Sequence, residues 1–312
     1  MTKKDLEQLK LLRAKDSLDE KEFYQLEYLE KKLINDERIN QFKQNQKETY
    51  ESKLSRAGNL AWEFYRDIDI SGQCYVAVGG LDSIVLYLFL RSIGIDVPAI
   101  SVSSLEDRSI QKVHRALGIH RLRPLKSKKA VIEEFGWPII SKETAGKISH
   151  LQHPTEGNAT VRHAIVTGET GAQGGYREGT RMQLAKRWLK LFGGADPEGK
   201  ALGYADPGIL ISDQCCYWLK ELPCELYHRR TGRWPYMGLM ASEKGRREKA
   251  LAINGCNYIS KNTRRSCPFA TFWRHDLLRL ALEMEDWYQE HWQEFRPIVK
   301  EDEEGEVLYG EP

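Results

Sequence analysis

Residues 74–83 read Cys74-Tyr75-Val76-Ala77-Val78-Gly79-Gly80-Leu81-Asp82-Ser83. The first five form an apolar run typical of a buried strand, the two glycines end it, and residues 83–93 show the periodicity of an amphipathic helix. The start of such a helix presents unpaired backbone N–H groups and a partial positive charge. Glycine lets an anion approach the amides closely. The segment therefore predicts a phosphate-binding loop at residues 78–83.

The residues that follow repeat this rhythm of strand and helix. Residues 97–102 have the pattern of a second strand, and residues 109–117 that of a second helix. Such alternation indicates parallel strands joined by right-handed crossovers. We therefore expect an α/β fold over residues 71–295, a Rossmann-like parallel sheet with flanking helices.

The two ends of the chain differ in composition from this central part. Residues 1–70 carry leucines at helical spacing among Lys, Glu and Gln, which predicts a helical arm or hairpin. Such an arm packs on the main domain or on a second copy of the chain, so a homodimer through these helices is one expectation. Residues 296–312 are acidic and lack periodicity, which predicts a poorly ordered tail.

The overall composition limits the classes of partner that the chain can be expected to bind. The chain is 41% hydrophobic and 29% charged, with a formal net charge of +2. Bulk charge therefore gives no general support to a nucleic-acid or membrane surface. No apolar run is long enough to span a bilayer, and the first residues contain no apolar signal core. We expect a cytoplasmic protein without a membrane segment.

Three further motifs follow the loop in order. The first is Cys215-Cys216 with Trp218 and Pro223. The second is Gly238-Leu239-Met240-Ala241-Ser242-Glu243 with Arg246 and Arg247. The third is Cys267-Pro268 followed by Phe272-Trp273 and Asp276.

These motifs resemble those of a known family. The loop resembles the PP-loop of the adenine nucleotide alpha hydrolase superfamily, whose usual form is Ser-Gly-Gly-Lys-Asp-Ser. The later motifs are similar to segments of phosphoadenosine phosphosulfate (PAPS) reductase relatives, closest to those carried by phages and prophages. The resemblance spans roughly residues 74–282. Val78 stands in place of the first serine and Leu81 in place of the lysine, so a hydroxyl donor and a positive charge are missing.

The resemblance implies an adenine nucleotide ligand: ATP, PAPS or adenylyl sulfate, with Mg²⁺ as a candidate ion. It implies that Gly238 borders the nucleotide and that Glu243 contacts a ribose hydroxyl or a metal. Arg246 and Arg247 are candidates for the phosphate charge that Leu81 does not supply. The alternative for these two arginines is a solvated helix face.

Two more groups of polar residues are candidates for the site. Ser104 and Glu106 follow the second strand, and ligands of parallel sheets bind outside the carboxyl ends of strands. Arg162 and His163 lie in a segment, residues 153–175, whose Gly, Thr and Asn content predicts a loop over a ligand. Arg162 is a candidate for anion binding, and His163 for general acid or base catalysis. A lone loop histidine is, however, more often a surface or packing residue.

The cysteines leave several interpretations open. Cys215 and Cys216 are candidate catalytic thiols, and with Cys256 and Cys267 they are candidate ligands of an iron–sulfur cluster or a zinc ion. Buried or free thiols are the alternative. The chain has no Cys-x-x-Cys and no Glu-Cys-Gly-Leu-His segment, and the resemblance ties cluster binding and PAPS reduction to those motifs. Both features argue against cysteine-based reduction.

Three functions remain as hypotheses. The first is an enzyme that binds ATP or a sulfonucleotide and transfers, activates or reduces a sulfur-containing group. The second is a non-catalytic nucleotide- or partner-binding protein. The third is a sulfurtransferase that modifies nucleic acid, for which a basic cluster offers contacts. That cluster comprises Arg121, Arg123, Lys126, Lys128 and Lys129.

Overall fold

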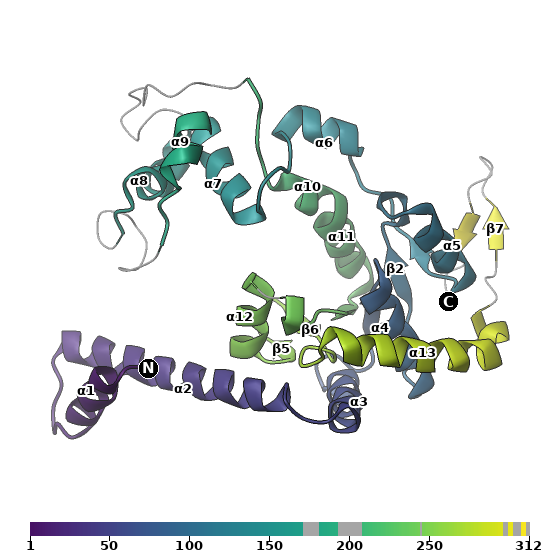
Figure 1. Cartoon of the computed structure of the whole chain (residues 1–312), viewed down its shortest axis with the longest axis horizontal. Coiled ribbons are helices and arrows are strands. Elements are labelled where there is room, and N and C mark those ends of the chain that lie inside the picture. Colours follow the sequence, from purple (N-terminus) through teal and green to yellow (C-terminus); the bar gives the residue numbers. More distant parts are fainter. Residues whose placement is uncertain (171–180, 193–207, 244, 296–298, 302–306, 310–312) are drawn as a thin grey trace. The chain divides into compact units, whose positions relative to one another are not determined.

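The computed structural model describes residues 1–170, 181–192, 208–243, 245–295, 299–301 and 307–309 (Figure 1). Its contacts divide the chain into two compact units. We call residues 1–122 with 227–312 the sheet unit, and residues 123–226 the inserted unit. No helix in the described part of the chain is long and apolar enough to cross a membrane.

A six-stranded sheet forms the centre of the sheet unit. Its strands are β1 (Cys74–Ala77), β2 (Ala99–Ser101), β3 (His120–Arg121), β4 (Trp234–Met237), β5 (Asn257–Ile259) and β6 (Arg264–Ser266). Their order is β3-β2-β1-β4-β6-β5, and all neighbours pair in parallel except β5 with β6. The expected α/β class with a mostly parallel, Rossmann-like sheet is therefore confirmed.

The position of β1 decides where a ligand site can form. Strand β2, the next along the chain, pairs with one edge of β1, and β4 pairs with the other, with Cys74 opposite Trp234 and Ala77 opposite Met237. The strand order thus reverses between β1 and β4. In open parallel sheets such a switch point leaves a crevice at the carboxyl ends of the two strands.

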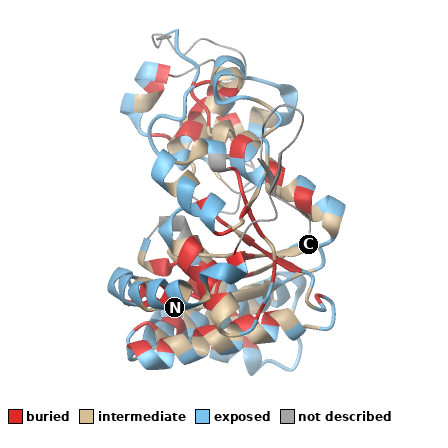
Figure 2. Cartoon of the chain, turned by 90° about the vertical axis from the view of Figure 1, so that its right-hand side faces the viewer, coloured by how far each residue is buried: buried red, intermediate tan, exposed pale blue. Residues whose placement is uncertain are grey.

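Helices cover the sheet and share its core. Helix α4 (Leu81–Ser92) is buried from Ile84 to Leu90, which explains why its apolar residues run without a polar face. It packs beside α13 (Arg274–His291). Figure 2 shows buried residues on the central strands and on parts of the surrounding helices. The largest fully buried side chains of this core include Phe64, Leu86, Tyr236, Phe269 and Phe272.

The N-terminal residues are helical, as expected, but they divide into two parts. Helices α1 (Lys3–Arg13) and α2 (Glu20–Asn45) pack against each other around Leu9, Leu12 and Leu29. Helix α3 (Tyr50–Arg66) instead buries Ala57, Ala61 and Phe64 in the core of the sheet unit. The segment expected as an arm therefore contributes its last helix to the sheet unit itself.

The inserted unit is built mainly from helices. They are α6 (Lys128–Phe135), α7 (Lys142–Gln152), α8 (Ala159–Thr167), α9 (Lys186–Phe192), α10 (Gln214–Cys216), the π-helical turn η3 (Tyr217–Glu221) and the first part of α11 (Leu222–Thr231). Its core contains Ile148, Leu151, Ile165, Leu189 and Ile211.

The structure contradicts part of one expected irregular segment and describes only part of another. Residues 153–175 were expected to form a loop, but residues 159–167 form α8, because Ile165 is buried in the core of the inserted unit and Val161 packs against that core. In the predicted tail, β7 (Val299–Glu301) pairs antiparallel with β8 (Val307–Tyr309). The remaining residues of the tail beyond residue 295 lie outside the described residues.

Candidate functional site

The loop between β1 and α4 is held by its own hydrogen bonds. Its last glycine, Gly80, is the N-cap of α4 and has no side chain with which to cap the helix. The Gly79 amide donates to Ser83 Oγ at 2.8 Å, and the Ser83 hydroxyl donates to the Gly80 carbonyl at 3.0 Å. Ser83 therefore bridges the two sides of the turn from the first turn of the helix.

A buried histidine supports the same loop from the neighbouring helix. His114, on α5 (Arg108–Ala116), is 1% exposed, and its Nε2 lies 2.8 Å from the Gly79 carbonyl oxygen. Because a carbonyl can only accept, Nε2 carries the hydrogen. Burial lowers the pKa of His114 below 6.5. The imidazole is thus a neutral donor that fixes the loop.

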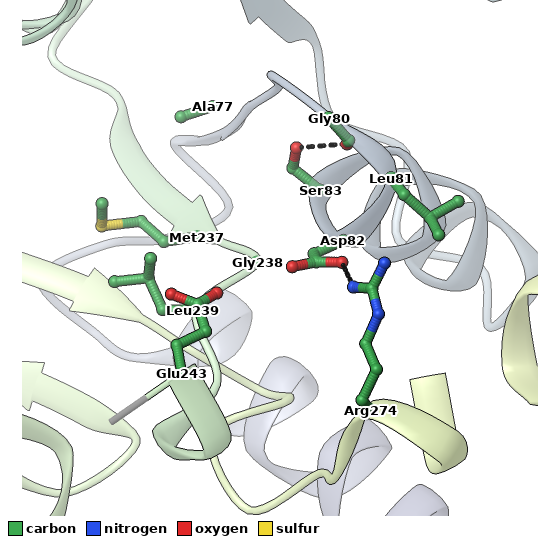
Figure 3. A pocket seen from close by; sticks show the side chains of 10 residues that line it. All are labelled: Ala77, Gly80, Leu81, Asp82, Ser83, Met237, Gly238, Leu239, Glu243 and Arg274. Carbon is green, nitrogen blue, oxygen red and sulfur yellow. Dashed lines mark hydrogen bonds and ion pairs between the residues drawn. The ribbon is translucent and has the colours of Figure 1, made fainter. Parts of the chain in front are cut away.

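A pocket of about 390 Å³ opens in front of the loop (Figure 3). It is lined by Ala77, Gly80, Leu81, Asp82, Ser83, Met237, Gly238, Leu239, Glu243 and Arg274. These residues come from the end of β1, the start of α4, the segment after β4 and the start of α13. The pocket therefore lies at the switch point of the sheet, and its volume falls within the range of small-molecule sites.

Gly238 allows the two sides of the pocket to meet. A Cβ atom at this position would lie 2.8 Å from the Asp82 carbonyl carbon and 2.8 Å from Ser83 N and Cα. These are backbone atoms of the first turn of α4, so they cannot move aside as the end of a side chain can. The segment after β4 can cross the helix start this closely only because residue 238 is glycine.

The charges of the pocket are two carboxylates and one guanidinium among the lining residues that the structure describes. Asp82 forms an ion pair with Arg274, the first residue of α13. In Figure 3 these two side chains face each other, and the carboxylate of Glu243 points into the pocket from the segment after β4. Met237 and Leu239 add an apolar wall.

The start of α13, which carries Arg274, is firmly anchored. The Trp273 amide donates to Asp276 Oδ2 at 2.8 Å, which caps the helix. Lys53 of α3 donates to the same oxygen at 2.8 Å, and the side chains of both ions are almost fully buried. The Trp273 indole Nε1 donates to the Gln46 carbonyl at 2.8 Å. Three contacts therefore fix the backbone from which Arg274 reaches the pocket.

The structure brings most of the predicted nucleotide-binding residues to one place. Residues 80–83, Gly238 and Glu243 line the pocket, and Gly79 lies in the loop. Glu106 lies beside it, with a carboxylate oxygen 3.6 Å from where a Cβ of Gly79 would be.

Other predicted residues lie elsewhere. Val78 is not among the lining residues, because it is buried and its amide donates to the Ile100 carbonyl at 2.8 Å. Ser104 is exposed in the turn η1 (Ser103–Leu105) and does not line the pocket. Arg246 and Arg247 belong to α12 (Gly245–Asn254), and their side chains lie outside the described part of the chain.

Sequence reasoning missed Arg274, His114, Met237 and Leu239. Leu239 stood inside a recognised motif and Arg274 directly after one, between Trp273 and Asp276, so their proximity to the loop could have been expected. No sequence signal marked His114, because its contact with Gly79 joins residues 35 positions apart.

Arg162 and His163 make local contacts on α8 of the inserted unit. Arg162 is 6% exposed, and its Nε donates to Asn158 Oδ1 at 2.9 Å. His163 Nε2 lies 2.6 Å from Glu169 Oε2. Arg162 therefore braces the turn that precedes its helix, and the proposed catalytic role of His163 stays a prediction.

Burial weakens the acidity of five of the six thiols. Burial raises the pKa of Cys224 and Cys256 to about 11 and that of Cys74 and Cys267 to about 12. Burial also raises the pKa of Cys215. Within the described residues, no three His, Cys, Asp or Glu side chains are grouped so as to hold a metal ion. The four predicted cysteine ligands thus find no support as a metal site there.

The chain matched no protein-family model, no curated protein and no solved structure. The geometry of the pocket therefore carries the argument about function.

Proposed function

We propose that the chain is a PP-loop protein of the PAPS reductase-like family that binds ATP or a sulfonucleotide in the pocket before loop 78–83. The observation that carries this proposal is the position of the loop. It joins the end of β1 to the N-terminus of α4 at the switch point of the sheet, and the close approach of Gly238 brings the segment after β4 against the start of the helix.

The lining of the pocket suits a nucleotide. Backbone amides and the helix N-terminus at Gly80 to Ser83 attract phosphates. Met237 and Leu239 provide apolar surface for a base, and Glu243 can accept a hydrogen bond from a ribose hydroxyl. A Mg²⁺ ion bound jointly by the phosphates and by Asp82 or Glu243 would offset the negative charge of the two carboxylates.

The proposed reaction is activation of a substrate by transfer of the adenylyl group, with release of pyrophosphate. Reduction of a sulfonucleotide requires a thiolate that attacks sulfur; burial raises the pKa of Cys215, one of the two candidate catalytic thiols, and the sequence contains no Glu-Cys-Gly-Leu-His segment. Among the sulfur chemistries expected from the sequence, activation therefore fits best.

A non-catalytic nucleotide-binding protein is the second candidate. The observation that favours it is Leu81, which lines the pocket where the resembling loops carry their lysine. Binding without release of pyrophosphate would identify this function. A salt-sensitive gel shift with RNA or DNA tests the nucleic-acid-modifying alternative.

Isothermal titration with ATP, PAPS and adenylyl sulfate, each with and without Mg²⁺, tests the proposal. We expect binding of at least one nucleotide and weaker binding by Ser83→Ala, which removes the bridge across the loop. Ser92→Ala is the matched control, because Ser92 lies on the same helix and its hydroxyl donates to the Phe89 carbonyl outside the pocket. The proposal fails if no nucleotide binds or if the two variants bind alike.

A further inference from the structure

The pocket lacks the loop cation that a polyphosphate would need. Leu81 supplies no charge, and Asp82 and Glu243 bring carboxyl groups. Arg274 is the only cation among the described residues that line the pocket. Any neutralisation of an anion by these residues therefore falls to Arg274.

The backbone of Arg274 is held in place, whereas its side chain is accessible to solvent. Its backbone is anchored by the bonds of Trp273 and by the buried pair of Lys53 and Asp276. Its side chain is 55% exposed, whereas that of its partner Asp82 is 24% exposed. The guanidinium can therefore turn to a ligand without any movement of the helix.

Asp82 holds this guanidinium at the edge of the loop. A guanidinium pairs with phosphate oxygens in the same bidentate geometry as with a carboxylate. A diphosphate or triphosphate carries more negative charge than Asp82 and would lie against the amides of the same helix start. The ion pair between Asp82 and Arg274 thus occupies the place that a phosphate would take.

We propose that Arg274 replaces the missing loop lysine as the cation that binds the ligand's phosphates, and that Asp82 is the internal competitor that holds it in the ligand-free pocket. This inference rests on the proposed nucleotide site and names the charged group that completes it. In this chain the cation is therefore on the first turn of α13 and not in the loop.

Titration with inorganic pyrophosphate and with ATP, both in EDTA, tests the inference. We expect Arg274→Met to weaken binding roughly tenfold, the loss of one charge-assisted contact at a partly exposed site. Arg274→Lys should recover part of the affinity. Arg279→Met is the matched control, since Arg279 is on the same helix, equally exposed, and paired with Glu51 and Glu283 rather than with a lining residue.

A double-mutant cycle tests the role of Asp82. Asp82→Asn should tighten pyrophosphate binding several-fold, and this gain should be much smaller in the Arg274→Met background, where only the direct repulsion between the carboxylate and the anion is removed. Circular dichroism verifies that each variant is folded. The inference is overturned if Arg274→Met binds like Arg279→Met, or if Asp82→Asn changes the affinity equally in both backgrounds. If the unaltered protein binds none of pyrophosphate, ATP, PAPS and adenylyl sulfate, with or without Mg²⁺, the proposed function fails as well.

Discussion

Gly238 shows how one absent side chain shapes the pocket. The segment after β4 crosses the first turn of α4 at a distance that leaves no room for a Cβ atom. The same contact brings Leu239 and Glu243 to the loop, so a local steric requirement determines which residues face the pocket. The sequence motif placed a glycine here, but only the fold shows which backbone it approaches.

We predict that Gly238→Ala destabilises the protein by about 1–3 kcal/mol, since the added methyl group meets backbone that can relieve the clash only by shifting. Thermal denaturation followed by circular dichroism measures the loss. Gly80→Ala is the control, because a Cβ at Gly80 would have no atom within 4 Å and its φ of −87° suits alanine. Equal melting temperatures for the two variants would contradict the steric account.

His114 makes the loop sensitive to acid. Its pKa is lowered by burial in the folded protein, so the unfolded chain takes up a proton at higher pH than the folded one does. The stability that depends on neutral His114 is complete above about pH 6.5 and is lost as pH falls through the lower, folded pKa.

We therefore predict that His114→Gln, which keeps an N–H donor but cannot titrate, loses less stability between pH 7 and pH 5 than the unaltered protein. Urea denaturation at a series of pH values provides the comparison. Parallel losses in the two proteins would mean that His114 does not couple the loop to pH.

At the scale of elements, helices α3 and α13 support the site through a buried contact between them. Lys53 of α3 and Asp276 of α13 form a buried ion pair, and the same carboxylate caps α13. Periodicity predicted that the segment of α3 is helical, but its charged residues looked like part of an arm. Burial of a lysine opposite an aspartate 223 positions away is a property of the packing alone.

We predict that Lys53→Met lowers the free energy of unfolding by about 3–5 kcal/mol, because it leaves Asp276 buried without its partner. Chemical denaturation measures the change. Lys129→Met is the control: Lys129 pairs with Glu133 on an exposed helix surface, where little change is expected. Adding Asp276→Asn to Lys53→Met should recover part of the loss; no recovery would argue against an unpaired charge as its cause.

Helix α8 illustrates why the sequence misled at this scale. The glycines, threonines and asparagines around residues 153–175 favoured a loop. Yet Val161, Ala164 and Ile165 follow helical spacing, and two of them are buried in the core of the inserted unit. Packing of this short apolar face outweighed the loop-like composition of its surroundings.

At the scale of the whole molecule, the described chain has two compact units with separate cores. We predict that Ile148→Ala, which empties a fully buried position of the inserted unit, costs that unit about 2–5 kcal/mol. Hydrogen exchange followed by mass spectrometry should show faster exchange in α7 and α8 and unchanged exchange in β1 and α4. A uniform increase across both units would show that they unfold together.

The sequence by itself predicted the parallel strand–helix pattern, the loop at residues 78–83 and the place of Gly238 and Glu243 beside that loop. Each of these depends on local periodicity or on a short motif, which neighbouring residues are sufficient to specify. Only the tertiary structure decided the strand order, the support of the loop by His114 and the ion pair of Arg274 with Asp82. Those features join residues far apart in the chain, and burial, steric fit and charge pairing between such residues exist only once the sheet has assembled.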